Sequence, residues 1–348
     1  MNIIFLIALF FLSAIQAQII KPVILDPQSR KHLILSCSIY NMNGKRLRRY
    51  PGSICVFEEN GNLLLSNNQK NELSFFDPNM RILWKIPMHI HHQINKTSDG
   101  DFLILSSESK IYRNKKIRFD RLIKINLKGE IVASFKFYDH KKAILKNINK
   151  RKLPLFKFGW DKDNQYLGEA ETSHSNSFYE IPVNDKSQLF PELQAGNFIV
   201  NPNNNGWIMI LDHSLTHILK FIKPPADRIH DVQITEKGEI LLYNNQVHYT
   251  QQIYSELQIY SYPDQNIIWN YHRNSSDFNY PDVGGVQLLG NDELLFSDIH
   301  IDSFKAILLN YKTKKELKVI IPEGYERLGA QQVKMQNLNS FLKLNKGP

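Results

Sequence analysis

Apolar and polar residues follow one layout that recurs along most of the chain. A short ladder of alternating apolar residues leads into a turn, usually at Gly, and a run of strand-forming residues follows. In residues 230–245 the ladder holds Val232 and Ile234, the turn lies at Gly238, and the strand-forming run covers 240–243. This layout predicts two antiparallel strands joined by a tight turn.

Six copies of the layout start near residues 53, 92, 174, 230, 284 and 331. The copy at 174 is longer, with its turn at 195–197, and one or two more strand-like runs follow most copies. Four-stranded units that repeat at roughly 40–50 residues are typical of β-propeller blades. The pattern therefore predicts an all-β protein that folds as a six-bladed β-propeller.

The two ends of the chain carry complementary parts of one blade. The last copy, at 331–344, has no strand-like run after it, whereas residues 33–50 form a strand pair ahead of the first copy. We expect these N-terminal strands to join the C-terminal blade, because that pairing closes the ring and leaves no open sheet edge.

Residues 1–17 contain an apolar run that ends at Gln16 and Ala17. The run is short for a transmembrane helix and predicts a signal peptide cleaved after Ala17, with an uncleaved anchor as the alternative. We expect a periplasmic or secreted protein without a stable membrane span. Residues 18–348 then form a single propeller domain, with an insertion at 139–170 on one face.

Export makes the two cysteines, Cys37 and Cys55, candidates for a disulfide, and two buried thiols are the alternative. The formal charge of +9 is compatible with anionic partners such as glycans or sulfate esters, although solvated Lys-rich loops are the explanation that we favour. No nucleic-acid-binding motif is present, so we expect no nucleic acid partner.

Three copies carry a His at the entrance of their first strand: His92, His174 and His230. The first strand of a blade lines the central channel, so rotation from blade to blade brings these histidines to one mouth of that channel. Imidazoles gathered there can bind a transition metal, hold an oxyanion by N–H donation, or act as nucleophile and acid–base groups. A purely structural role within the strands is the alternative.

These motifs resemble those of the bacterial PAPS-independent arylsulfate sulfotransferases (the arylsulfotransferase family), which are six-bladed propellers of the periplasm. The resemblance covers roughly residues 55–300 and rests on three short motifs in the same order along the chain. The motifs are His91 and His92 with Asp99, Gly100 and Asp101; then His174, Ser175, Asn176 and Ser177; then His230 and Asp231 with Gly238, Asn244 and Asn245.

The resemblance implies transfer of a sulfuryl group from a phenolic sulfate ester to a phenol, with no cofactor and no metal. It implies that His230 is the nucleophile and becomes a transient sulfohistidine, while His92 and His174 hold the sulfuryl oxygens. Three neighbours of these histidines would bind substrate: Asn176, His91 and Asp231. Sulfuryl transfer spreads negative charge over the equatorial oxygens, so preorganised donors lower its barrier.

One departure from the family bears on catalysis. Where the family has an Arg after the second motif, this chain has Asn203. Loss of one charged oxyanion donor costs on the order of 10²–10³ in rate. Three arginines elsewhere are candidates to replace it: Arg113, Arg228 and Arg273.

Two other functions remain open on the sequence. A non-catalytic propeller that binds a glycan, peptide or protein is the alternative to the enzyme. A metal-dependent hydrolase or lactonase is a third reading, and it is disfavoured because such a site needs several channel carboxylates, of which only Asp231 is well placed.

Overall fold

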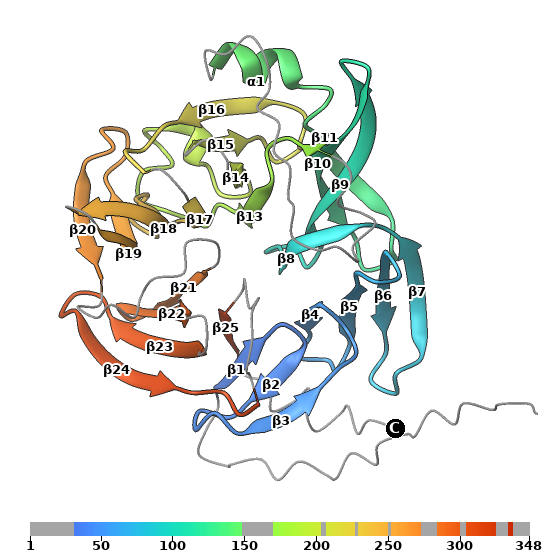
Figure 1. Ribbon diagram of the computed structural model, residues 1–348, viewed down its shortest axis with the longest axis horizontal. Coiled ribbons are helices and arrows are strands. Elements are labelled where there is room, and N and C mark those ends of the chain that lie inside the picture. The colour runs from blue at the N-terminus through green and yellow to red at the C-terminus, as the bar shows by residue number, and fades with distance from the viewer. Residues whose placement is uncertain are drawn as a thin grey trace, which may run out of the picture.

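The computed structural model describes residues 31–147, 170–202, 207–226, 229–249, 252–272, 284–299, 304–324 and 333–336. Its strands form six sheets around a central axis (Figure 1). In five sheets the strands follow in chain order from the axis outward, and the remaining sheet joins the two ends of the chain. The predicted all-β, six-bladed β-propeller is confirmed.

Three blades come from the first part of the chain. The first complete blade holds β4 (Ile54–Phe57), β5 (Leu63–Asn67), β6 (Glu72–Phe76) and β7 (Ile82–Pro87). The second holds β8 (Ile90–Lys96), β9 (Phe102–Tyr112), β10 (Lys115–Ile125) and β11 (Ile131–Lys136), with the short β12 (Ala170–Glu171) beside β10. The third holds β13 (Ser175–Glu180), β14 (Phe198–Pro202), β15 (Ile208–Leu211) and β16 (Ile218–Ile222), with the 3-10 helix η2 (Pro191–Leu193) in its long first turn.

The other three blades complete the ring. The fourth holds β17 (Ile229–Ile234), β18 (Ile240–Tyr249), β19 (Gln252–Tyr260) and β20 (Ile267–Tyr271). The fifth holds β21 (Val286–Gly290), β22 (Glu293–Ile299), β23 (Phe304–Asn310) and β24 (Lys315–Ile320). The closing blade holds β25 (Val333–Gln336), β1 (His32–Leu35), β2 (Ser38–Tyr40) and β3 (Arg46–Arg49).

The closing blade joins the two ends of the chain as predicted. β25 is its innermost strand and pairs antiparallel with β1, so that Leu33 lies opposite Met335. Lys31 Nζ lies 3.3 Å from Glu293 Oε2 and holds the start of this blade against the fifth one. Ring closure pairs the edge of β1 that would otherwise stay open.

The repeated turns explain the glycines in the sequence pattern. Gly100 and Gly238 have φ angles of 91° and 69°, in the left-handed region that favours glycine. Their N–H groups donate to the carbonyls of Thr97 and Thr235 at 3.0 and 2.9 Å, which closes each turn. In the copy at 284 the same place is taken by Asp292, at φ 63°. Asp tolerates this conformation better than most residues do.

Apolar side chains fill the spaces between neighbouring blades. One cluster joins Leu105 and Phe135 of the second blade to Phe198 and Met209 of the third, all of them buried. A single blade cannot cover its own apolar faces, so the ring as a whole provides the burial that stabilises each sheet.

Cys37 and Cys55 form a disulfide, with their Cα atoms 5.0 Å apart. Cys37 lies between β1 and β2, and Cys55 lies in β4. The bond therefore links the closing blade to the first complete blade. The sequence left open a disulfide or two buried thiols, and the structure has the disulfide.

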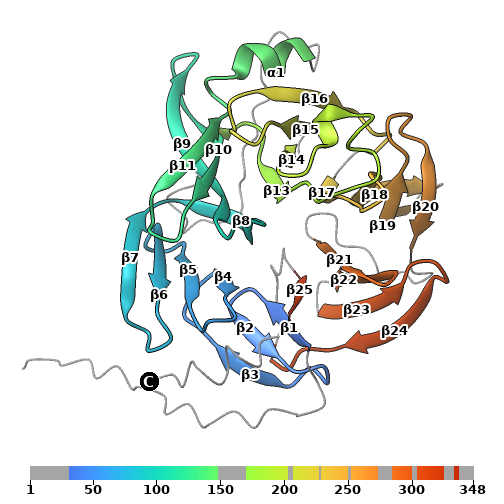
Figure 2. The ribbon, with the colours of Figure 1, turned by 180° about the vertical axis from the view of Figure 1, so that it is seen from behind.

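The insertion predicted at 139–170 contains α1 (Lys141–Asn147), and its residues 148–169 lie outside the described part. Figure 2, the view from behind, places α1 at the outer rim beside β16, as Figure 1 does. Ile144 of α1 is buried in the cluster between the second and third blades. The predicted signal peptide, residues 1–17, also lies outside the described residues. Among the described helices, none has the length and apolar character needed to cross a membrane.

Candidate functional site

The inner strands β8, β13 and β17 belong to three successive blades and run in the same direction. Asn176 Nδ2 donates to Ile229 O at 3.2 Å, and one residue further along β13 the Ser177 hydroxyl accepts from Val232 N at 3.1 Å. The ends of β8, β13 and β17 that come first in the chain therefore lie at one end of the channel. The predicted histidines His92, His174 and His230 lie there, and we call this end the histidine mouth.

His92 and His174 are in direct contact. Their Nε2 atoms lie 2.9 Å apart, and their rings meet edge to face with centroids 4.6 Å apart. One of the two nitrogens must carry a proton for this hydrogen bond to exist. Both residues have positive φ angles, 57° and 46°, which are uncommon for non-glycine residues and cluster at functional sites.

The carboxylate of Glu171 lies against His174, and the guanidinium of Arg118 binds that carboxylate. His174 Nδ1 lies 2.5 Å from Glu171 Oε1. Arg118 binds the other oxygen of Glu171 through Nε at 2.9 Å and Nη2 at 2.7 Å. Burial raises the pKa of Glu171, but His174 and Arg118 outweigh it, and the net pKa is lowered. Glu171 is therefore ionised, and its carboxylate lies against the Nδ1 side of His174.

His91 lies beside this pair and contacts a second carboxylate, that of Asp120. Its ring stacks on that of His174 with centroids 6.0 Å apart, and its Nε2 lies 3.3 Å from Asp120 Oδ1. Asp120 also accepts from Ser175 N at 2.6 Å and from the Ser173 hydroxyl at 2.9 Å. Burial raises the pKa of Asp120, and contacts with His91 and Ser175 bring the net pKa below its usual range. The predicted substrate contact His91 is thus in contact with Asp120 through Nε2.

His230 has a different and well-defined partner. It is buried, and its Nδ1 lies 2.9 Å from Asn245 Oδ1. An amide oxygen only accepts, so the proton of this hydrogen bond is on Nδ1. The sequence placed Asn244 and Asn245 in the third motif, and Asn245 is the hydrogen-bond partner of His230.

The predicted substrate contacts Asn176 and Asp231 face the neighbouring blades. Asn176 donates to Ile229 O, as described above, and Asp231 Oδ2 accepts from Val286 N at 3.1 Å and from the Tyr179 hydroxyl at 3.2 Å. Asp231 is buried, and burial raises its pKa to about 7. Both side chains therefore join blades through hydrogen bonds.

These contacts belong to a repeated device. Gln93 Oε1 accepts from Phe178 N at 2.7 Å, in the same way as Ser177 accepts from Val232 N and Asp231 from Val286 N. The inner strands β8, β13 and β17 thus each offer one acceptor side chain to the backbone of the next inner strand. The device satisfies buried N–H groups that no ladder within a blade can reach.

Some polar atoms near the histidine mouth are left over. Ser175 Oγ, Asn176 Oδ1 and Asn201 Oδ1 are buried and have no hydrogen-bond partner among the described residues. Native structures leave few such atoms, and those that occur often mark functional positions.

The structure also explains why the copy at 284 lacks a histidine. A Cβ on Gly284 would lie 2.1 Å from Cε1 of Tyr243, whose hydroxyl donates to Ser297 O at 2.9 Å. The Tyr243 ring therefore fills the space that a side chain at 284 would need.

The family arginine has no described counterpart at its own position, because Asn203 lies outside the described residues, as do the candidates Arg228 and Arg273. Arg113 lies in the turn between β9 and β10. The cation nearest to the histidine pair by described contacts is Arg118, which sequence reasoning missed. Within the described residues, no group of three or more His, Cys, Asp and Glu side chains is arranged to hold a metal ion.

Neither a family model nor a curated protein matches the chain. Among solved structures, a protein of unknown function from Bacteroides caccae is similar, with 13% identity, a TM-score of 0.51, and 85% of this chain and 95% of that chain covered. Virginiamycin B lyase from Staphylococcus aureus has 12% identity and a TM-score of 0.45, over 84% of this chain and 75% of that one. At such identities the similarity to the Bacteroides protein shows the fold alone, and we base no argument on the lyase.

Proposed function

We propose that this propeller is an exported enzyme of the arylsulfotransferase type, which moves a sulfuryl group from a phenolic sulfate ester to a phenol through His230. The observation that carries the proposal is the contact between His230 Nδ1 and Asn245 Oδ1 at 2.9 Å. Because Nδ1 donates to this amide oxygen, the nucleophile in our proposal is Nε2, which attacks in its unprotonated form.

The reaction then runs in two displacements. His230 Nε2 attacks sulfur, the N–S bond forms, and the S–O ester bond breaks so that the phenolate leaves with the electron pair. The phenolate takes a proton and departs. The oxygen of the acceptor phenol attacks the same sulfur, the N–S bond breaks, and the acceptor proton is lost as His230 is restored.

In this proposal the His92 and His174 pair donates N–H groups to the sulfuryl oxygens, which requires the hydrogen bond between their Nε2 atoms to open when substrate binds. Glu171, which is itself paired with Arg118, lies against His174, and the rings of His92 and His174 are in direct contact. Donors that are already in place stabilise the charge that develops in the transition state without reorganisation. The same pair can supply the proton for the leaving phenolate.

A binding protein without catalysis is the second candidate, and one observation favours it. Arg118 is engaged by Glu171 through two nitrogens, so this guanidinium is not available to hold a sulfate. Under this alternative the histidine mouth binds part of a glycan, peptide or protein.

Export forms part of the proposal. Disulfides persist in oxidising compartments, and the Cys37–Cys55 bond fits one. The apolar run of residues 1–17 supplies the export signal, and the net charge of +9 suits anionic sulfate esters.

The test is sulfuryl transfer from methylumbelliferyl sulfate to a panel of phenols. Wild-type protein should transfer the sulfuryl group, and His230→Ala should not. Asn245→Leu should transfer it roughly 10²-fold more slowly, which is in the range for loss of one oriented catalytic group. His213→Ala is the matched control, because His213 is exposed in the turn after β15. Folded wild-type protein that transfers nothing across the panel would overturn the enzyme and favour the binding protein.

A further inference from the structure

The end of the channel opposite the histidine mouth holds a pocket of about 520 Å³. Its lining includes one residue from each of five inner strands: Asn95 of β8, Tyr179 of β13, Gln233 of β17, Gln287 of β21 and Lys334 of β25. A volume of this size is typical of sites for small organic ligands. No sequence motif pointed to this end of the channel.

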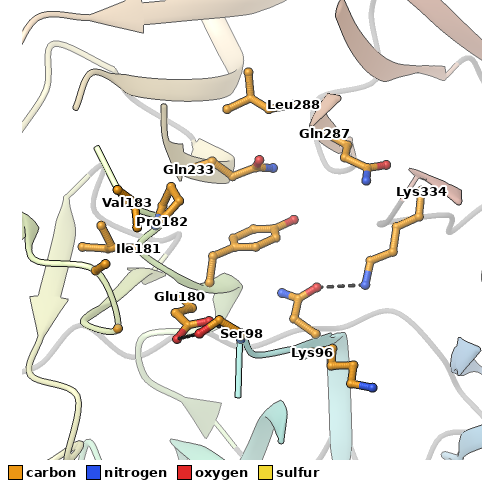
Figure 3. A pocket seen from close by; sticks show the side chains of 14 residues that line it. Lys96, Ser98, Glu180, Ile181, Pro182, Val183, Gln233, Gln287, Leu288 and Lys334 are labelled. Carbon is orange, nitrogen blue, oxygen red and sulfur yellow. Dashed lines mark hydrogen bonds between the residues drawn. The ribbon is translucent and has the colours of Figure 1, made fainter. Parts of the chain in front are cut away.

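Lys334 supplies the positive charge of the pocket. Figure 3 shows its side chain reaching into the space that Gln233 and Gln287 also face. Its ammonium group donates to Ile94 O at 3.0 Å and to Asn95 Oδ1 at 2.8 Å. An ammonium group has three N–H donors, so these described contacts leave one for a ligand.

The other ionic side chains of the pocket have partners of their own. Lys96 is ion-paired with Glu58. Glu180 accepts from the backbone N–H of Ser98 at 2.6 Å and from its hydroxyl at 2.9 Å, which uses both carboxylate oxygens without neutralising the charge. Lys334 is therefore the cation that we assign to a ligand.

The pocket adds an amide donor and an apolar wall. Gln233 Nε2 donates one N–H to Val286 O at 2.5 Å, and its second N–H remains for a ligand. Ile181, Pro182 and Val183 form one side of the pocket, Leu288 also belongs to its lining, and Val183 is 79% exposed. An ammonium and an amide N–H above an apolar wall match a planar anionic head on an apolar body.

We propose that this pocket binds a small organic carboxylate, with the carboxylate oxygens on Lys334 Nζ and Gln233 Nε2 and the apolar body against Val183, Pro182 and Leu288. One ammonium group matches one negative charge, whereas a doubly charged phosphate ester is better served by several cations or an arginine fork. The site is separate from the histidine mouth, so the proposal that it binds a carboxylate does not depend on sulfuryl transfer.

Binding should also depend on pH. Burial lowers the pKa of Lys334 to about 8, against the attraction of Asp231. The ammonium is charged below that pH and loses its proton above it, so carboxylate affinity should fall as pH rises through about 8. The other ionisable groups that line the pocket are Tyr179, Lys96 and Glu180, and Asp231 interacts electrostatically with Lys334 from outside the lining.

The experiment is calorimetric titration of the intact protein with hexanoate, hexanol and hexyl sulfate. Hexanoate should bind best, and Lys334→Met should weaken it by at least about tenfold, the effect of losing one charged hydrogen bond. Lys96→Met is the matched control, because Lys96 lines the same pocket but pairs with Glu58, and it should leave the affinity within about twofold of wild type.

Lys334→Met could fail to fold because Lys334 lies in the strand that closes the ring. A second variant therefore tests the same site away from that strand. Val183→Asp changes an exposed lining residue and should weaken hexanoate several-fold by charge repulsion, while leaving the melting temperature in place. His230→Ala should bind hexanoate as wild type does. The proposal is overturned if wild-type protein ignores hexanoate, if hexanol or hexyl sulfate binds as tightly, or if folded Lys334→Met or Val183→Asp binds hexanoate unchanged.

Discussion

Replacing Asp231 with Asn should remove a pH-dependent loss of stability that the wild-type fold carries. The carboxyl group is 3% exposed, one oxygen accepts from Val286 N and the Tyr179 hydroxyl, and the other has no described partner. Burial raises the pKa of Asp231 from 3.8 to about 7. An Asn side chain keeps the accepting oxygen and replaces the unpartnered oxygen by a neutral amide nitrogen.

The sign follows from proton binding. Because the folded pKa is raised, the folded state holds a proton on Asp231 between about pH 4 and pH 7 that the unfolded chain has already lost. The stability from this group is therefore fully present below the unfolded pKa and falls as pH rises through the folded pKa. At 1.36 kcal/mol for each pKa unit, the loss between about pH 5 and pH 7 amounts to about 2–3 kcal/mol.

The assay is urea unfolding of wild type and Asp231→Asn at several pH values from about 5 to 7. Burial lowers the pKa of Lys334 to about 8, so this range stays below the titration of Lys334. The stability of the variant relative to wild type should rise by about 2–3 kcal/mol across that range, while other titrating groups cancel in the difference. Asp292→Asn is the control: a salt bridge with Lys312 lowers the pKa of Asp292, so it stays ionised throughout and its difference should be flat. A flat difference for Asp231→Asn as well would refute the reasoning.

Two further predictions concern how the ring is held together. The Cys37–Cys55 bond closes a loop with a sequence separation of 18, so Cys55→Ala should lower the free energy of unfolding by about 3 kcal/mol in urea melts, and reductant should affect wild type but not the variant. Gln93→Leu leaves the buried N–H of Phe178 unpaired and should cost about 1–3 kcal/mol in the same melts, whereas the exposed Gln194→Leu should cost nothing measurable; equal effects would contradict the role of Gln93 between blades.

The blades were predictable because their signal is local and repeated. Turn glycines such as Gly100 and Gly238 need positive φ, and the apolar runs around them need two strands with a buried side. Ring closure followed from counting strands at the two ends of the chain. The same register placed His92 and His174 at one mouth, where they are in contact.

The groups that support the site were not predictable in this way. Glu171 follows the insertion, and Arg118 lies in the extended part of β10, 53 residues earlier, where no repeat pattern points to it. Their contact exists because β12 lies beside β10 with Arg118 opposite Glu171. Asn245 lay in a stretch that the sequence marked, yet only the distance to His230 shows its role. The acceptor role of Asp231 between blades likewise depends on a neighbour 55 residues away.

The most direct test of the central claim is mass spectrometry of the protein after brief exposure to an aryl sulfate without acceptor. The account predicts one sulfuryl adduct, on the peptide that contains His230, and its loss when a phenol is added. His230→Ala should carry no adduct, and His213→Ala should carry the same adduct as wild type. An unmodified His230 in protein that releases phenol from the donor, or an adduct on another residue, would contradict a sulfohistidine at His230.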